Sequence, residues 1–189
     1  FAVDKVLEFG GEMLGLAAQM DSWETKVNTV FEGQSDSVRQ WADSNNEAFG
    51  LTDNKLAGLA ASFGDLLKPM GFTSSEAAGM SKEVVGLAGA LSAWSGGQVS
   101  AEETTQILAD AMLGERDALK QLGISISQAD VDARLAAKGQ QELTVAAREQ
   151  AEAVATQELI FEKSTDAQKA WAEGGNEALA AQNKMKASM

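Results

Sequence analysis

Cysteine and histidine are both absent from the 189-residue sequence. Their absence removes disulfide bonds, thiolate nucleophiles and the imidazole groups on which most zinc sites and serine or cysteine hydrolases depend. The redox compartment stays undetermined, because no cysteine reports on it. Carboxylate chemistry is therefore the one kind of catalysis that the composition leaves open.

Proline and tyrosine are nearly missing as well, with Pro69 as the single proline and no tyrosine. Long runs of β-branched residues do not occur, so a large sheet has little to build with. Alanine is abundant, and together these features predict an all-α fold. Hydrophobic residues make up 44% of the chain, which is enough for a packed core and argues against wholesale disorder.

Positive charge is scarce throughout the sequence. The net charge is −13, with 6 basic against 13 acidic residues in 1–95 and 9 against 15 in 96–189. Proteins that neutralise phosphates need clustered lysine and arginine, so we expect no direct binding to nucleic acid and repulsion from an anionic membrane surface. We also expect no membrane span, because the most apolar stretch, "VVGLAGALSAW", is interrupted by Gly86, Gly89 and Ser92.

The chain begins at Phe1, without a methionine or the charged and apolar regions of a signal peptide. We therefore expect it to be a segment of a longer parent chain.

Start and stop signals divide the sequence into a series of predicted helices. Thr73 and Glu76 form a capping box, after which apolar residues recur three and four apart as far as Trp94. Ser100 and Glu103 predict a second capping box. Glycines, and Pro69 with Gly71, mark the helix ends. The predicted helices cover residues 2–31, 35–48, 52–68, 74–94, 101–113, 115–122, 127–138 and 144–163, the last resuming through Trp171, and "ISIS" at 124–127 is a short extended connector.

These segments predict a multi-helix bundle of short glycine-separated helices with a longer alanine-rich C-terminal helix. We divide the chain into an N-terminal helical segment (1–34) that continues from the parent, a compact helical core region (35–142) and an alanine-rich C-terminal helix or helices (143–189). The short connection after Pro69 predicts an antiparallel hairpin. Its expected core is Leu56, Leu59, Phe63, Leu66, Met80, Val84, Leu87, Leu91 and Trp94.

The charged residues do not assemble into a catalytic pattern. Glu115 and Asp117 flank Arg116 in the first turn of a short helix, where negative charge complements the helix dipole. Asp130 and Asp132 are two residues apart on a helix, so their carboxylates point about 200 degrees apart and do not share a ligand. We therefore predict no catalytic, cofactor-binding or metal-binding residue, and no enzyme activity.

Two further patterns have structural interpretations. Gly96-Gly97 is not a phosphate loop, since no lysine follows at the required spacing and no strand precedes it. The four tryptophans each lie at the apolar phase of a predicted helix, which favours core anchors over a ligand box. They are Trp23, Trp41, Trp94 and Trp171.

Three motifs in a fixed order resemble the tape measure protein of tailed bacteriophages. They are "GMSKEV.GLAG.L..W" at 79–94, a Gly-Glu pair at 114–115 that precedes "LKQLGI" at 119–124, and "STDAQ" at 164–168. The resemblance covers most of residues 37 to 171, and residues 112–124 look like the family's most recognisable turn, where one helix stops and the next starts.

The resemblance implies structural work. Tape measure proteins lie along the lumen of the growing tail tube, set its length and leave ahead of the DNA. They contact tail tube subunits, tail assembly chaperones and tail-tip proteins, and self-association in the lumen is compatible with this role. The implied location is the virion tail lumen, with the host cytoplasm during assembly. The alternative is an independent acidic helical scaffold or chaperone-like binding module of a prophage cluster.

Overall fold

A computed structural model describes residues 22–175 together with Glu177, Ala181 and Met185. These residues form helices and connecting turns with no strand among them, which confirms the predicted all-α bundle. Residues 22–31 are helical, whereas the start of that predicted helix lies outside the described residues. The elements that follow are η1 (Glu32–Gln34), α2 (Ser35–Phe49), α3 (Asp53–Leu67), α4 (Ser74–Trp94), α5 (Ala101–Met112), η2 (Asp117–Leu122), α6 (Gln128–Ala137), α7 (Val145–Lys163), α8 (Thr165–Ala170) and η3 (Trp171–Gly175).

Side-chain caps fix the starts of α3, α4, α5, α6 and α7. The Thr73 hydroxyl accepts a hydrogen bond from the Glu76 amide while the Glu76 carboxylate accepts from the Thr73 amide, so the predicted capping box is confirmed. At Ser100 only half of the predicted box forms. The Ser100 hydroxyl accepts from the Glu103 amide at 3.1 Å, but the Glu103 carboxylate accepts no hydrogen bond from the Ser100 amide. An unpredicted box joins Ser127 to Asp130 at the start of α6.

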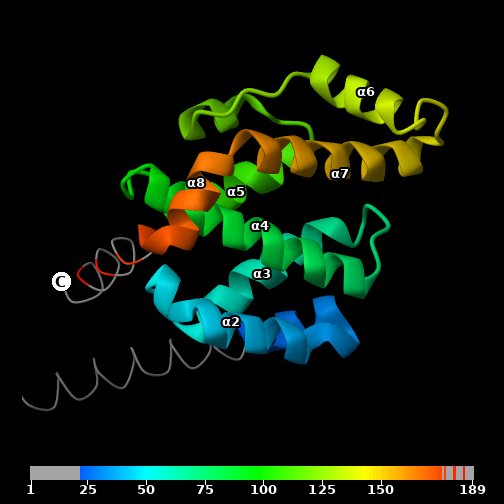
Figure 1. Ribbon diagram of the computed structural model, residues 1–189. Coiled ribbons are helices and arrows are strands. Elements are labelled where there is room, and N and C mark those ends of the chain that lie inside the picture. Colours follow the sequence, from blue (N-terminus) through cyan, green and yellow to red (C-terminus); the bar gives the residue numbers. More distant parts are fainter. Residues whose placement is uncertain (1–21, 176, 178–180, 182–184, 186–189) are drawn as a thin grey trace, which may run out of the picture.

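The long helix α4 lies at the centre of the bundle, between α3 and α5 and beneath α8 (Figure 1). Its sequence predicts one apolar face, yet it is buried on several faces. The reason is that alanine, serine and glycine occupy the positions between the large apolar residues, and such small side chains let neighbouring helices approach closely. Ser81 and Ser92, for example, are both fully buried.

The predicted hairpin core is largely confirmed. Five of its nine residues are buried in one cluster, namely Leu56, Phe63, Val84, Leu87 and Leu91, and Leu59, Leu66 and Met80 pack against that cluster while partly exposed. The prediction for Trp94 is wrong, because its side chain is 59% exposed. Helical periodicity fixes the direction in which a side chain points, but Trp94 is the last residue of α4 and lies where the packing ends.

Two of the remaining tryptophans join α2 to η3, the last continuous turn that the structure describes. The Phe49 ring is 6.4 Å from that of Trp41 and 5.5 Å from that of Trp171, each pair in an edge-to-face arrangement at 70°. Both tryptophans pack against the core cluster, as the sequence predicted. The aromatic group therefore ties α2 to the short π-helical turn η3.

The alanine-rich C-terminal part forms α7 and, after a break at Ser164, the short helix α8. In Figure 1, α6 lies against the outer side of α7, away from α4. Only Val131 and Leu135 of α6 are buried. Ion pairs supply much of the rest of this contact, and they join Arg134 to Glu158 and Glu162, Lys138 to Glu158, and Asp132 to Arg148.

Across the part of the chain that the structure describes, every helix is too short or too polar to cross a membrane.

Candidate functional site

The charged triplet at 115–117 lies between two glycine-terminated helices. Gly114 follows α5 with a φ of 107°, and the next amide, of Glu115, donates to the Asp110 carbonyl at 2.9 Å. Gly123 ends η2 with a φ of 73° and is followed by a bond from the Ile124 amide to the Leu119 carbonyl. Side-chain-bearing residues rarely adopt such φ values, so both positions favour glycine. Residues 112–124 thus form the helix stop and restart that the sequence predicted, but the predicted start at Glu115 is wrong. The second helix begins at Asp117, so Glu115 precedes it and only Asp117 lies in its first turn.

The three charged side chains do not converge on one point. Asp117 pairs with Lys120 at 2.9 Å, and the hydrogen bond and charge of that lysine hold the pKa of Asp117 below its ordinary value. Glu115 is exposed and makes no ion pair among the described residues. Arg116 points toward neighbouring helices instead, so the triplet is not an acid-base group.

Arg116 connects three elements that are far apart in the sequence. Its Nη1 donates to Gln128 Oε1 at 2.8 Å, while its Nε and Nη2 donate to the Thr156 hydroxyl at 3.4 and 3.3 Å. Thr156 is fully buried in α7, and Gln128 is the first residue of α6. Sequence reasoning missed this role because the partners are 12 and 40 residues away and leave no local pattern.

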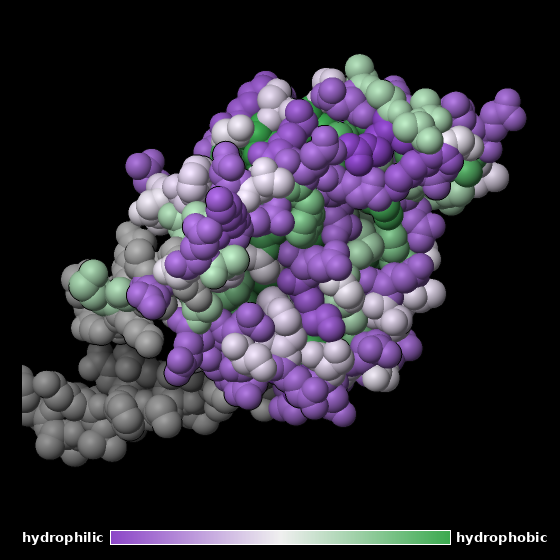
Figure 2. Space-filling view, viewed as in Figure 1, coloured by the Kyte–Doolittle hydropathy of each residue, from purple (hydrophilic) through white to green (hydrophobic). Residues whose placement is uncertain are grey.

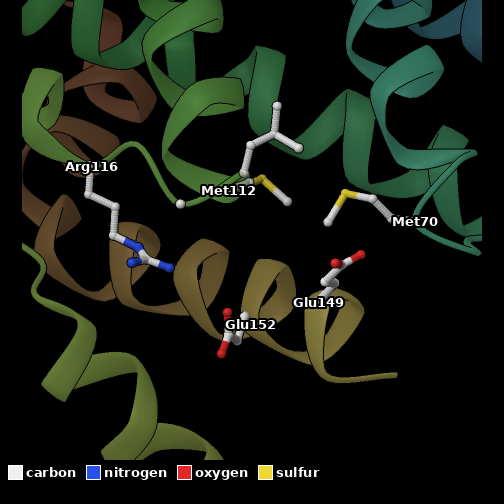
Figure 3. Close-up of a pocket in the computed structure, with 7 residues that line it drawn as sticks. Met70, Met112, Arg116, Glu149 and Glu152 are labelled. Carbon is white, nitrogen blue, oxygen red and sulfur yellow. The ribbon is translucent and has the colours of Figure 1, made fainter. Parts of the chain in front are cut away.

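A cleft of about 280 Å³ opens beside Arg116, between the ends of α3 and α5 and the first half of α7. Figure 3 shows Met70 and Met112 on one wall and Glu149 and Glu152 on the other, and the Glu149 carboxylate points toward Met70. Glu152 accepts from Arg148 Nε at 2.8 Å. No ion pair involves Glu149 within the described residues. Within the described part of the chain, the cleft therefore combines an apolar wall with the Glu149 carboxylate, which has no ion-pair partner, and the Arg116 guanidinium, which bonds only neutral side chains.

Asp130 and Asp132 point to different partners, as their spacing predicts. The Asp130 carboxylate accepts from the Ser127 amide and hydroxyl, both at 2.7 Å, and these bonds lower its pKa. Asp132 pairs with Arg148 at 2.9 Å. Within the part of the chain that the structure describes, no three carboxylates are grouped in a way that would hold a metal ion.

Comparison with known proteins finds no family model, no curated sequence and no solved structure that matches the chain. Its function is therefore inferred from its own residues and geometry.

Proposed function

We propose that this chain is a structural segment of a phage tail tape measure protein, which sets tail length during tube assembly and is released ahead of the DNA at ejection. The supporting observation is that the residues carrying the resemblance pack into one core. Leu119 and Ile124 of the second motif, and Ser164 and Ala167 of the third, are buried, as is much of α4, which contains the first motif. The motifs that resemble the family therefore supply buried residues of the core, so the resemblance concerns residues on which the fold depends.

The third motif also has a specific structural task. The Ser164 hydroxyl donates to the Ile160 carbonyl at 2.7 Å, and Gln168 Nε2 donates to the Phe161 carbonyl at 2.7 Å. These bonds satisfy carbonyls that lose their helical partners at the break between α7 and α8. Residues 164–168 therefore shape the return of the chain onto α4, which supports a role in architecture and requires no catalytic residue, metal or cofactor.

The proposed partners are tail tube subunits, tail assembly chaperones and tail-tip proteins, with self-association in the tail lumen as a further possibility. We infer that this segment itself binds no nucleic acid, because its basic side chains are dispersed and many pair with carboxylates.

An independent acidic helical scaffold or chaperone-like module is the second candidate. It is favoured by one feature, the three large apolar side chains Leu113, Leu143 and Val145, which are exposed to solvent and could be covered by a partner.

Cross-linking mass spectrometry of purified particles from the encoding phage or prophage distinguishes the two candidates. The tape measure proposal expects peptides of this chain in mature tails, with lysine cross-links to tube or tip subunits. Lys55 lies in α3 and Lys82 in α4, so a cross-link between these two lysines would report that the hairpin is folded in the particle. A chain that is present in infected cells but absent from mature tails contradicts the proposal and supports the scaffold or chaperone.

A further inference from the structure

The first half of α7 has a cleft on each side. One is the 280 Å³ cleft that contains Glu149 and Glu152, and the other, of about 340 Å³, contains Ala147, Ala151 and Val154. At 100 degrees per residue these two sets of positions lie on opposite sides of the helix. The second cleft is completed by residues of the α3–α4 and α6–α7 connections, including Phe72 and Leu143.

Exposed apolar side chains lie beside both clefts. Leu113 lines the first cleft and Leu143 the second, and Val145, four residues before Glu149, lies on the same side of α7 as the first cleft. The exposed fractions of Leu113, Leu143 and Val145 are 52%, 36% and 78%. The rest of the visible surface is mainly hydrophilic, although apolar areas show over α6 and in the furrow between α7 and α4 (Figure 2). We call the first cleft, together with Leu113 and Val145, the α7 shoulder.

The charges at the α7 shoulder are unbalanced. Three exposed acids, Glu115, Glu142 and Glu149, make no ion pair among the described residues. Of the neighbouring basic groups, Lys138 pairs with Glu158, and Arg148 pairs with both Asp132 and Glu152. Arg116 lines the first cleft and, within the part of the chain that the structure describes, donates only to the neutral side chains of Gln128 and Thr156, so its charge offsets one of the three acids. An approaching partner therefore meets apolar surface bordered by an excess of negative charge.

We propose that the α7 shoulder binds a basic amphipathic helix of a partner protein. The apolar side chains of such a helix cover Leu113 and Val145. One of its lysines enters the methionine-walled cleft, with its aliphatic stem along Met70 and Met112 and its ammonium group at Glu149. Methionine suits this task because its flexible, polarisable side chain adapts to different neighbours. The proposal does not depend on the tape measure assignment.

Charge decides among the possible occupants. A second copy of this chain carries the same net charge of −13 and meets repulsion at an acidic border. Nucleic acid and anionic lipid are repelled for the same reason. A basic amphipathic helix makes favourable contacts with both parts of the surface, because its apolar side chains cover the apolar part and its lysines pair with the acids.

The test uses the full chain and two synthetic helical peptides of about 18 residues, long enough to span about 27 Å. Both carry leucine at helical spacing on one face, and the other face carries lysine in one peptide and glutamate in the second. Isothermal calorimetry is expected to show micromolar binding of the lysine peptide and at least tenfold weaker binding of the glutamate peptide. Equal affinity for the two peptides, or no binding of either, overturns the proposal.

Location is tested with ¹³C-methyl-methionine spectra, assigned through Met70→Leu and Met112→Leu. The lysine peptide is expected to shift the Met70 and Met112 signals and leave Met80, which packs on the core, in place. Glu149→Lys is expected to weaken binding about tenfold, whereas the matched variant Glu47→Lys, at an exposed acid on α2, leaves affinity within twofold. Equal losses in both variants, or shifts confined to other methionines, show diffuse attraction to an acidic protein and contradict a specific site.

Discussion

The Phe49 ring packs directly against the backbone of Gly89, so closely that a Cβ atom added to Gly89 would lie 2.6 Å from two ring carbons. The ring has little room to withdraw, because Phe49 is 1% exposed and also contacts the rings of Trp41 and Trp171. The contact between α2 and α4 therefore depends on a glycine inside the central helix, where glycine would otherwise weaken the structure.

Gly89→Ala should destabilise the protein by about 1–3 kcal/mol, because overpacking at Phe49 outweighs the better helix propensity of alanine. Gly86→Ala is the matched control in the same helix, since no heavy atom lies within 4 Å of its added Cβ. The free energy of unfolding of Gly86→Ala should rise by about 0.5–1 kcal/mol. Urea unfolding measures both, and stabilisation of the protein by Gly89→Ala would show that α2 does not pack as described.

Leu87→Ala should cost about 2–5 kcal/mol, because a side chain that is 4% exposed in the core leaves a cavity when it is truncated. Trp94→Ala should change stability by no more than about 0.5 kcal/mol, since it removes an exposed side chain seven residues further along the same helix. Chemical denaturation compares the two. A larger loss for Trp94→Ala than for Leu87→Ala would mean that the end of α4 is covered.

Acid should weaken the start of α4 through Glu76. The pKa of Glu76 lies below its ordinary value because the Thr73 amide and then the Thr73 hydroxyl donate hydrogen bonds to the carboxylate. The stabilisation is therefore complete above the ordinary value of about 4.3 and is lost as the pH falls through the lower pKa of the folded state.

Glu76→Gln should therefore lower stability at neutral pH and flatten the loss of stability between about pH 5 and about pH 3. Glu47→Gln serves as the control, at an exposed acid outside any capping box. Thermal unfolding followed by circular dichroism across this range provides the measurement. If the stability of Glu76→Gln fell with pH as steeply as that of the unchanged protein, the capping box would not have the role described here.

The outer helix α6 should open before the rest of the bundle. Two buried side chains and a set of partly exposed ion pairs hold it on α7, and such pairs weaken as salt screens them. Hydrogen exchange should be faster in α6 than in α4, and the difference should grow between low and high salt. Equal protection of the two helices at both salt concentrations would refute this order of stability.

Local signals account for what could be predicted from the sequence. Thr73 and Glu76 of the capping box lie three residues apart, and each helix-ending glycine, Gly114 and Gly123, is a single position. The capping box and the two glycines could therefore be recognised without knowing the tertiary structure. The helix boundaries followed from them. The hairpin of α3 and α4 was also predictable, because the connection between them is short.

Contacts between distant segments account for what could not be predicted. Gly89 looked like an interruption of an apolar stretch, whereas it accommodates a ring from a residue 40 positions earlier. Arg116 looked like a surface charge, and its partners Gln128 and Thr156 lie on helices that only the fold brings together. The cleft beside Glu149 combines the ends of α3 and α5 with α7, and no spacing in the sequence predicts it.

In-frame deletion of residues 52–139 from the parent gene tests most directly whether this region acts as a packed structural segment of a tail. If the region lay along the tube as a continuous helix, its removal would shorten tails by about 130 Å, at about 1.5 Å per residue. The capped and mutually packed helices predict a different result in electron micrographs, namely tails of unchanged length that fail in assembly or in DNA delivery. Complete tails shortened by the full 130 Å, as expected from the helical rise, would contradict a packed bundle in the particle.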